Sequence, residues 1–276
     1  FTPEDIYKIP ERDAHSNKGT YGRTVVIAGN ARMSGAAYLA AEASYRSGSG
    51  LVEIVTHNNN TAVLKELIPE AIVDGYDNND AVDVVKNAAD RASRIIIGPG
   101  LGTDETARNI VYKVIDSAEC PLIMDADALN IIADDISLLK KCKSTVIITP
   151  HIGEMERLCH IPKDDILRDI AGFAARFAAE NNVICVLKDA ATVVASPDGG
   201  LYINTSGCAA MSKGGMGDVL TGVISGMLAC RLEPFSAAAM GVYIHGLAGC
   251  AASEGKSLHS VKAGDLFEYI GTVMCK

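Results

Sequence analysis

Short apolar runs rich in β-branched residues alternate along the chain with longer segments in which apolar residues recur every three or four positions. The short runs are typical of buried strands, and the longer pattern is typical of amphipathic helices. Strands are therefore predicted over residues 24–28, 51–56, 94–98, 121–125, 145–149 and 183–187. Residues 192–196 and 201–204 flank the turn PDGG and are predicted to form a hairpin.

Helices are predicted over residues 34–47, 61–68, 81–89, 103–117, 163–181, 216–230, 234–254 and 262–274. An alternation of strands and helices predicts right-handed crossovers and a mainly parallel sheet. The C-terminal part of the chain is almost entirely helical and should cover one face of that sheet. We expect residues 1–276 to form a single domain whose ligands bind outside the carboxyl ends of the strands.

The composition indicates how the core is built and excludes two classes of partner. Hydrophobic residues make up 48% of the 276 positions, aromatic residues make up 5%, and tryptophan is absent. The core must therefore consist of Ala, Val, Ile and Leu, which suits a parallel sheet closely covered by helices. The formal net charge of −9 argues against binding of nucleic acid or of an anionic membrane surface.

The chain has eight cysteines, with no CxxC pair and no spacing typical of a zinc site. A protein of this size needs no disulfides, so we expect reduced and mostly buried thiols. No long, uninterrupted apolar run occurs, and the charged N-terminal segment lacks the apolar core of a signal peptide. These features predict a cytoplasmic protein that does not span a membrane.

The segment SKGGMGDVLTG, residues 212–222, places three glycines just before an apolar helical run. Glycines let the backbone approach a ligand, and the free N–H groups of a helix start can then bind an anion. Asp218 falls in the first helical turn, where the helix N-terminus is expected to lower its pKa. We predict that Asp218 either accepts a hydroxyl proton during phosphoryl transfer or simply caps the helix.

Two more glycine-rich loops follow predicted strands. GPGLG at residues 98–102 indicates a phosphate or substrate loop, or else a plain strand-to-helix turn. The loop at residues 29–35 is not a Walker A loop, because Ala36 and Ala37 stand where Lys and Ser or Thr are required.

Acidic residues and a histidine follow two other predicted strands. Asp125 and Asp127 are candidates for helix caps, or for organising a cation through water. Direct metal ligation by both carboxylates is the less favoured interpretation. Glu154 is interpreted as a helix cap, and His151 as a substrate contact.

The positions of Lys188 and His245 in the predicted elements suggest roles for these two basic side chains. Lys188 ends a predicted strand, so it is either a solvated terminus or a charge directed at a nucleotide phosphate. The spacing alone does not decide between these. His245 lies on an apolar helical segment, and we interpret it as a core histidine rather than a ligand-binding one.

These pieces occur in one order: KGTYG (18–22), a glycine loop ending at Ala36, GPGLG (98–102), DADALN (125–130), TPHIGE (149–154), LKDAAT (187–192) and GGMGD (214–218). The order resembles the ADP/ATP-dependent NAD(P)H-hydrate dehydratase family, within the ribokinase-like superfamily. The resemblance implies an α/β protein, namely a ribokinase-like three-layer α/β/α sandwich with a mainly parallel central sheet.

The resemblance also implies an enzyme that uses ADP or ATP to remove water from the S epimer of hydrated NADH or NADPH. The nucleotide would be converted to AMP or ADP with release of phosphate. The resemblance further implies a Mg²⁺ ion bound through the nucleotide phosphates, with no metal-ligating side chain, and a homo-oligomer such as a tetramer. An epimerase unit, which some members carry at the N-terminus, is not expected. The alternatives are a small-alcohol kinase of the same fold and a non-catalytic nucleotide-binding module.

Site roles follow from the resemblance at matching positions. Asp218 would take the proton from the hydroxyl group of the hydrate, which then attacks the terminal phosphoryl group. The anion hole would consist of Gly215, Met216 and Gly217. The hydrated dinucleotide would contact Ala36, Gly100, Gly102, His151 and Asp218. The adenine nucleotide would contact Lys188, Asp189, Ala190, Ala191, Thr192, Asn204 and Gly217.

Three residues depart from the family pattern. Asp189 replaces a usual Gly, Ile152 a usual Pro, and Lys213 a usual Thr. None of these is the proposed base. Asp189 places a negative charge close to the expected nucleotide, and this bears on nucleotide affinity and on the choice between ADP and ATP.

Overall fold

In residues 1–275, which the computed structural model describes, seven parallel strands and an antiparallel hairpin form one sheet. The strand order is β3-β2-β1-β4-β5-β6-β7-β8-β9. The parallel strands are β1 (Arg23–Ile27), β2 (Leu51–His57), β3 (Ile72–Tyr76), β4 (Arg94–Ile97), β5 (Leu122–Met124), β6 (Val146–Ile148) and β7 (Ile184–Leu187). The predicted hairpin is confirmed as β8 (Val193–Ala195) and β9 (Leu201–Ile203).

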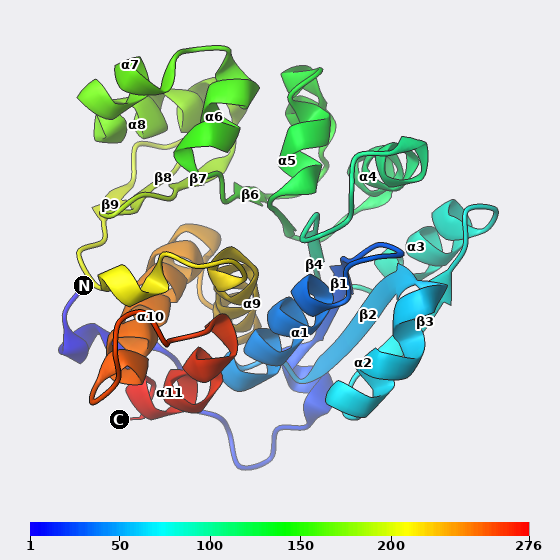
Figure 1. The fold of residues 1–276 in the computed structure, drawn as a ribbon, viewed down its shortest axis with the longest axis horizontal. Helices are drawn as coiled ribbons and strands as arrows, with labels where there is room; N and C mark the ends of the chain where they lie inside the picture. The colour runs from blue at the N-terminus through cyan, green and yellow to red at the C-terminus, as the bar shows by residue number, and fades with distance from the viewer. Residues whose placement is uncertain (276) are drawn as a thin grey trace.

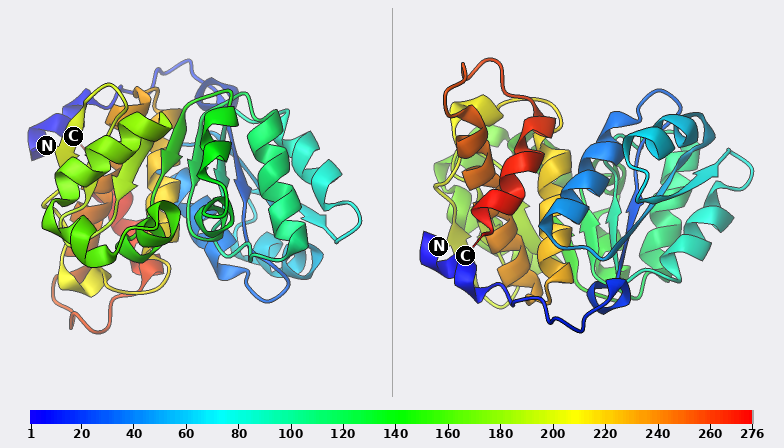
Figure 2. Two further views of the ribbon diagram at one scale, coloured as in Figure 1. Left: turned by 90° about the horizontal axis from the view of Figure 1, so that it is seen from above. Right: turned by 90° about the horizontal axis from the view of Figure 1, so that it is seen from below.

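Helices cover both faces of the sheet, as Figures 1 and 2 show. One layer contains α1 (Gly35–Ser47), α2 (Thr61–Leu67), α9 (Met216–Ala229) and α10 (Pro234–Ser253), and α11 (Leu266–Val273) packs on α10 and α1. The opposite layer contains α3 (Ala81–Ala89), α4 (Glu105–Ser117), α5 (Asp127–Ile132), α6 (Ile152–Cys159), α7 (Lys163–Arg168) and α8 (Ile170–Asn181). The predicted three-layer α/β/α sandwich is therefore confirmed.

The alternation of side chains along a strand explains why the inner strands are apolar on both faces over most of their length. Val25 and Ile27 of β1 belong to the core under α3 and α4, whereas Val26 belongs to the core under α1 and α9. All three side chains are fully buried. Because each strand residue is covered by one layer or the other, the sheet requires continuous apolar runs of the kind found in the sequence.

Besides α5 and α6, which are not among the predicted helix ranges, the structure differs from the predicted elements in three places. Strand β3 was not predicted, because it is a half-exposed edge strand interrupted by Asp74 and Gly75. The predicted helix 163–181 is two helices, which separate at Asp169 because its backbone leaves the helical region and its side chain caps α8. The predicted helix 262–274 begins with a 3₁₀ turn, so α11 starts only at Leu266.

Helix α10 is long and apolar enough to cross a membrane by length and composition alone. It is nevertheless 72% buried inside the protein over that window, where it packs against α9, α11 and the sheet. This composition suits a core helix, since most of its surface is covered by other elements.

All eight cysteines are unpaired, as predicted. Only Cys185 and Cys230 are buried, however, and most of the others are half-buried. The expectation of mostly buried thiols was therefore wrong, because several of the apolar runs that carry them lie at helix ends or in loops.

Helices α1 and α9 approach each other closely through small residues. A Cβ atom on Gly222 would lie 2.4 Å from the carbonyl oxygen of Ala40, and one on Gly226 would lie 2.7 Å from the backbone carbonyl carbon of Ser47. The Ser44 and Ser47 hydroxyl groups also reach the carbonyl oxygen of Gly222, at 3.4 and 3.3 Å. A larger side chain at Gly222 or Gly226 would push the two helices apart and move α9 relative to the sheet.

We expect Gly226→Ala to lower the free energy of unfolding by about 1–3 kcal/mol, because the added methyl group meets backbone that cannot move aside. Gly271→Ala on α11 is the matched control, since a Cβ there meets nothing within 4 Å. That control should be neutral or slightly stabilising, because Ala is the better helix former. Thermal and chemical unfolding measure both values, and equal changes for the two variants would contradict the close contact.

Candidate functional site

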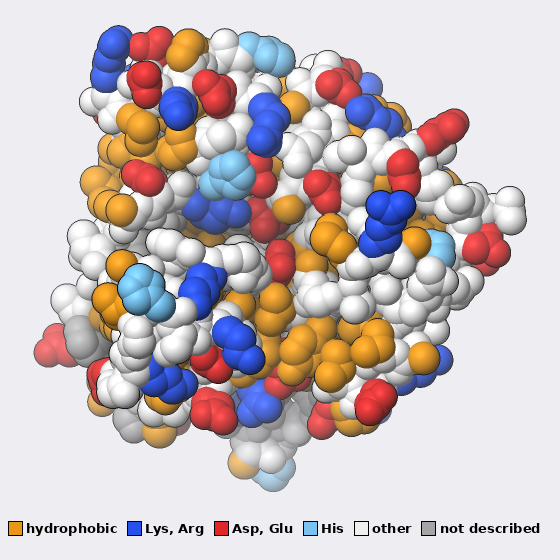
Figure 3. Space-filling model, in the orientation of Figure 1, with side chains coloured by type: hydrophobic (Ala, Val, Ile, Leu, Met, Phe, Trp, Pro, Cys, Tyr) orange, Lys and Arg blue, Asp and Glu red, His pale blue; other side chains and the backbone are white. Residues whose placement is uncertain are grey.

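The carboxyl ends of β1, β4, β5, β6 and β7 lie at one edge of the sheet, and the first turn of α9 lies against them. The strand order reverses at β1, which pairs with β2 on one side and β4 on the other. In open α/β sheets, ligands bind in the crevice outside the strand ends at such a point. Figure 3 shows acidic, basic and histidine side chains gathered in the hollow between the two helix layers.

The GPGLG loop after β4 requires its glycines. Gly98, Gly100 and Gly102 all have positive φ angles, of +115°, +61° and +84°. A Cβ on Gly98 would lie 2.0 Å from the carbonyl oxygen of Asp125, and one on Gly100 would lie 3.1 Å from the Cβ of Ala36. Of the residues predicted to bind the dinucleotide, Ala36 in the first turn of α1 thus lies against Gly100, and Gly102 belongs to the same loop as Gly100. Helix α4 starts only after this loop and is capped by Asp104.

Asp125 and Asp127 do not cap a helix, so that interpretation was wrong. Helix α5 begins after Ala126, and no side chain caps it. The carboxylate of Asp127 instead accepts a hydrogen bond of 2.8 Å from the N–H of Gly102 and so fixes the GPGLG loop. Asp125 is 2% exposed and points toward Lys188.

Lys188 is not a solvated strand end, because neighbouring carboxylates hold its ammonium group. Its Nζ donates a hydrogen bond of 2.7 Å to Asp125 and lies 3.9 Å from a carboxylate oxygen of Glu154. Burial alone lowers the pKa of Lys188, but these carboxylates more than offset it, so the pKa is raised and the ammonium stays charged. A Cβ on Gly217 would lie 3.3 Å from this Nζ, which places the cation against the first turn of α9.

His151 and Glu154 form a capping box at the start of α6. The N–H groups of Gly153 and Glu154 donate to Nδ1 of His151, and Glu154 accepts from the N–H of His151. The predicted capping role of Glu154 is thus confirmed. The second role of Glu154, as a buried partner of Lys188, has no local sequence signal, because it depends on two strands coming together. Burial raises the pKa of Glu154, and the charge of Asp125 adds to this effect.

The predicted anion hole lies at the N-terminus of α9, where the backbone leaves N–H groups free. Gly215 has a φ of +89°, and a Cβ there would press on Leu39. The N–H groups of Gly217 and Asp218 have no acceptor within the described part of the chain, whereas that of Met216 lies 3.5 Å from the carbonyl oxygen of Lys213. Two N–H groups of the first turn are thus free to bind an anion, as helix N-termini commonly do.

Asp218 does not cap α9: its carboxylate makes no hydrogen bond to the described residues. The pKa of Asp218 is raised to about 6, first by burial and then by the charge of Asp125, while Lys188 lowers it. The expectation that the helix N-terminus lowers this pKa was therefore wrong, because desolvation and the neighbouring carboxylate outweigh the helix dipole. A buried carboxylate that titrates near neutral pH is a stronger base than an exposed one.

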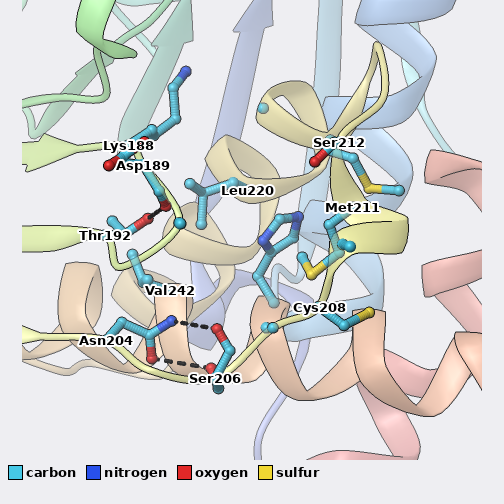
Figure 4. A pocket seen from close by; sticks show the side chains of 17 residues that line it. Lys188, Asp189, Thr192, Asn204, Ser206, Cys208, Met211, Ser212, Leu220 and Val242 are labelled. Carbon is cyan, nitrogen blue, oxygen red and sulfur yellow. Dashed lines mark hydrogen bonds between the residues drawn. The ribbon is translucent and has the colours of Figure 1, made fainter. Parts of the chain in front are cut away.

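A cavity of about 630 Å³ opens beside the first turn of α9 (Figure 4). Lys188, Asp189 and Thr192 lie on one side of it, Met211 and Ser212 on the other. Leu220 and Val242 provide apolar surface between the two sides. Of the residues predicted to bind the adenine nucleotide, six line this cavity: Lys188, Asp189, Ala190, Thr192, Asn204 and Gly217. Ala191 is exposed and does not line it.

Asn204 lines the cavity but uses its amide to build the cavity wall. Its Nδ2 donates to the carbonyl oxygen of Ser206, and its Oδ1 accepts from the hydroxyl groups of Ser206 and Tyr202. The structure also places His245 in this wall. The sequence interpretation of His245 as a core residue is confirmed for its burial, but it missed the cavity, which is formed by segments far apart in the chain.

Comparisons with known proteins show the family to which the chain is similar. A family model described as NAD(P)H-hydrate dehydratase matches residues 24–272. The ADP-dependent (S)-NAD(P)H-hydrate dehydratase of Bacillus subtilis (strain 168) is 38% identical over 267 residues, which cover 96% of this chain and 93% of that protein. The bifunctional NAD(P)H-hydrate repair enzyme of Moorella thermoacetica is 35% identical over 275 residues. These cover 97% of this chain but only 52% of that relative, so the chain spans about half the length of the bifunctional protein.

The fold of this chain is also similar to the folds of solved structures. The ADP/ATP-dependent NAD(P)H-hydrate dehydratase of Bacillus subtilis, co-crystallized with ATP/Mg²⁺, has a TM-score of 0.86 and 37% identity, covering 99% of this chain and 96% of that chain. The ribokinase of Arabidopsis thaliana has a TM-score of 0.56 at 10% identity, covering 91% of this chain and 98% of that chain. The second likeness shows the fold alone, and it confirms the predicted ribokinase-like architecture.

The raised pKa of Asp218 predicts a pH-dependent gain in stability when its charge is removed. An unfolded Asp ionises near 3.8 and Asp218 ionises near 6, so stability is lost as the pH rises through this window. We expect Asp218→Asn to raise the free energy of unfolding at pH 8 by up to about 3 kcal/mol, and to have little effect below pH 4.

Thermal unfolding of wild type and variant at both pH values measures this difference. Asp135→Asn is the control with the opposite sign, because hydrogen bonds from Ser137 lower the pKa of Asp135. A gain in Asp218→Asn that is the same at pH 4 and pH 8 would show that its cause is not the carboxylate charge.

Proposed function

Because the chain belongs to the NAD(P)H-hydrate dehydratase family, we propose that it uses ADP or ATP to dehydrate the S epimer of hydrated NADH or NADPH. The product would be NADH or NADPH, with AMP or ADP and phosphate released. The observation that carries the proposal is the position of Asp218. It is a buried carboxylate with a pKa of about 6 in the first turn of α9, next in the chain to Gly217, which lines the cavity, and close enough to Asp125 and Lys188 for their charges to act on it.

Asp218 would act as the general base. At neutral pH its carboxylate is mostly ionised, so it can accept the proton of the substrate hydroxyl group. That oxygen then attacks the terminal phosphorus of the nucleotide, and the bond from this phosphorus to the bridging oxygen breaks. The lone pair of the ring nitrogen then expels the phosphate formed on the substrate, which breaks its carbon–oxygen bond and leaves an iminium ion. Loss of a proton from the adjacent ring carbon, to water or to the released phosphate, forms the ring double bond of the reduced nicotinamide.

The phosphoryl group would be bound by backbone groups rather than by a cluster of cations. The N–H groups of Gly217 and Asp218 point from the start of α9, and Lys188 adds one positive charge nearby. In phosphoryl transfer, positioning and charge stabilisation provide most of the rate enhancement. A carboxylate base with a raised pKa and two oriented amides would serve this purpose.

The two ligands would approach Asp218 from opposite sides. The hydrated dinucleotide would lie along Ala36, Gly100, Gly102 and His151, which surround the strand ends of β1, β4 and β6. The adenine nucleotide would fill the cavity lined by Lys188, Asp189, Ala190, Thr192 and Asn204. Ala191 would contribute through the backbone of the same loop.

Mg²⁺ would enter with the nucleotide. Within residues 1–275, no group of three or more His, Cys, Asp or Glu side chains is placed to hold a metal ion. The cation would therefore be bound through the phosphates, where it neutralises their charge. We also infer a homo-oligomer such as a tetramer, and a reducing compartment such as the cytoplasm, consistent with eight unpaired cysteines.

The decisive measurement is recovery of the reduced cofactor. We expect hydrated NADPH, or hydrated NADH, with Mg²⁺ and ADP or ATP to regain the absorbance of the reduced nicotinamide and to release orthophosphate. Asp218→Asn should lower turnover by about a thousandfold or more, because the base is lost, while nucleotide binding is kept. A stable phosphorylated alcohol would instead identify a small-alcohol kinase. Full activity of Asp218→Asn would show that another group is the base.

The charge of Asp189 predicts a specific weakness in nucleotide binding. Asp189 is exposed and lines the nucleotide cavity, where it repels the phosphates. We expect Asp189→Asn to lower the KM for ADP by about three- to tenfold at low salt, and the KM for ATP by more, because ATP carries more negative charge. Asp164→Asn on α7, in the opposite helix layer, should change neither KM. An unchanged KM in Asp189→Asn would show that this carboxylate does not repel the nucleotide.

A further inference from the structure

Another pocket, of about 660 Å³, borders the glycine loop that precedes α9. We call it the lysine pocket, and it is lined by Leu39, Lys213, Gly214, Lys262, Ala263, Gly264 and Asp265. The glycine loop passes between this pocket and the nucleotide cavity, since Ser212 lines the cavity and Lys213 lines the lysine pocket. A ligand in the lysine pocket would therefore lie next to the anion hole without sharing the nucleotide cavity.

The lysine pocket continues the proposed binding site of the hydrated dinucleotide. Leu39 lies one turn after Ala36 on α1. A Cβ on Gly215 would lie 2.6 Å from Cδ1 of Leu39, so this wall of the pocket touches the start of α9. Gly215 stands three residues before Asp218 in the chain. The pocket is thus close both to the proposed base and to a residue expected to bind the hydrate.

The lysine pocket carries an excess of positive charge, although the chain as a whole has a net charge of −9. Lys213 and Lys262 are both exposed. Nζ of Lys213 donates a hydrogen bond to the carbonyl oxygen of His259, which leaves the other N–H bonds of this ammonium group for a ligand. Asp265 adds a negative charge, but its carboxylate accepts a hydrogen bond of 2.9 Å from the N–H of Lys262 and lies 3.9 Å from Nζ of Lys256.

A phosphate of the hydrated dinucleotide suits these surroundings. Lysine ammonium groups bind phosphates as point charges, and apolar side chains such as Leu39 pack on the sugar or the base. One ribose separates the nicotinamide ring from the pyrophosphate, so a ring that reacts at Asp218 places its pyrophosphate in a neighbouring pocket. Hydrated NADPH carries a further phosphate on the adenosine ribose. Figure 3 shows basic side chains next to hydrophobic ones below the hollow that contains the site.

We propose that Lys213 and Lys262 bind a phosphate group of the hydrated dinucleotide and thereby contribute to the affinity for this substrate. The proposal rests on the proposed function, because it takes the hydrate to react at Asp218. The two lysines act in binding alone: they do not touch the phosphoryl group that is transferred, which lies at the N–H groups of Gly217 and Asp218.

The test compares the KM values of wild type, Lys213→Gln and Lys262→Gln, because glutamine removes the charge and keeps a long polar side chain. We expect each variant to raise the KM for hydrated NADPH about three- to tenfold at low salt, with little change in kcat or in the KM for the nucleotide. Lys213→Arg keeps the charge and should stay close to the wild type. Added salt should reduce the difference between wild type and the glutamine variants, since it screens exposed charges.

Fluorescence titration with NADPH, the reaction product, gives a second readout that needs no turnover. The Kd for NADPH should rise in both glutamine variants by a similar factor. Lys140→Gln is the matched control, because it removes the same charge from the 3₁₀ turn Ile136–Lys141 in the opposite helix layer. It should change neither the KM for the hydrate nor the Kd for NADPH. Thermal unfolding shows whether each variant is folded.

The two hydrates identify the phosphate that is bound. An equal rise in the KM for hydrated NADH and hydrated NADPH assigns the pyrophosphate, which both contain, and a rise confined to hydrated NADPH assigns the phosphate on the adenosine ribose. If the wild type regenerates the reduced cofactor and the folded glutamine variants keep the KM for both hydrates, or change only the KM for the nucleotide, the role of the lysines is wrong while the proposed function stands. If the wild type dehydrates neither hydrate, the proposed function is wrong and the role of the lysines falls with it.

Discussion

The close approach of α9 to α1 is the contact on which the site depends. Helix α9 lies against α1 through Gly222 and Gly226, where no side chain would fit. Because the two axes are this close, the first turn of α9 reaches the edge where β5 and β7 end, and Gly217 meets Asp125 and Lys188 there. The anion-binding N–H groups and Asp218 are thus positioned by packing on a helix about 180 residues earlier in the chain, rather than by their own loop.

The buried charges of the site are compensated only by neighbouring side chains of the site. Asp125, Glu154 and Asp218 lie around a single cation, Lys188, and burial makes every one of these charges costly. Asp125 is hydrogen-bonded to Lys188, whereas the pKa is raised for Glu154 and for Asp218, whose carboxylate makes no hydrogen bond to the described residues. A carboxylate that is unstable when ionised is a good proton acceptor, so the same desolvation that costs stability favours base catalysis. The overall charge of −9 has no direct part in this balance.

The buried strands could be predicted from the sequence because each is covered on both faces and therefore reads as a continuous apolar run. The edge strand β3 could not, because one edge and part of one face are open to solvent and tolerate Asp74 and Gly75. The break at Asp169 was missed for a similar reason. Apolar residues continue at helical spacing across it, and only the capping contact with Gly172 shows that a new helix begins.

The sequence motifs by themselves determined which chemical groups are present and where in the secondary structure they lie. These are glycines where the backbone needs positive φ, a carboxylate in the first turn of α9, and polar residues at strand ends. The motifs determined this because backbone conformation and helix polarity are local properties. Tertiary structure decided which of these groups act together. It pairs Lys188 with Asp125, gives Glu154 a second role, leaves Nε2 of His245 unpaired in a cavity wall, and reverses the expected pKa shift of Asp218. Burial and charge–charge interactions sum over neighbours from distant segments, so no local pattern contains them.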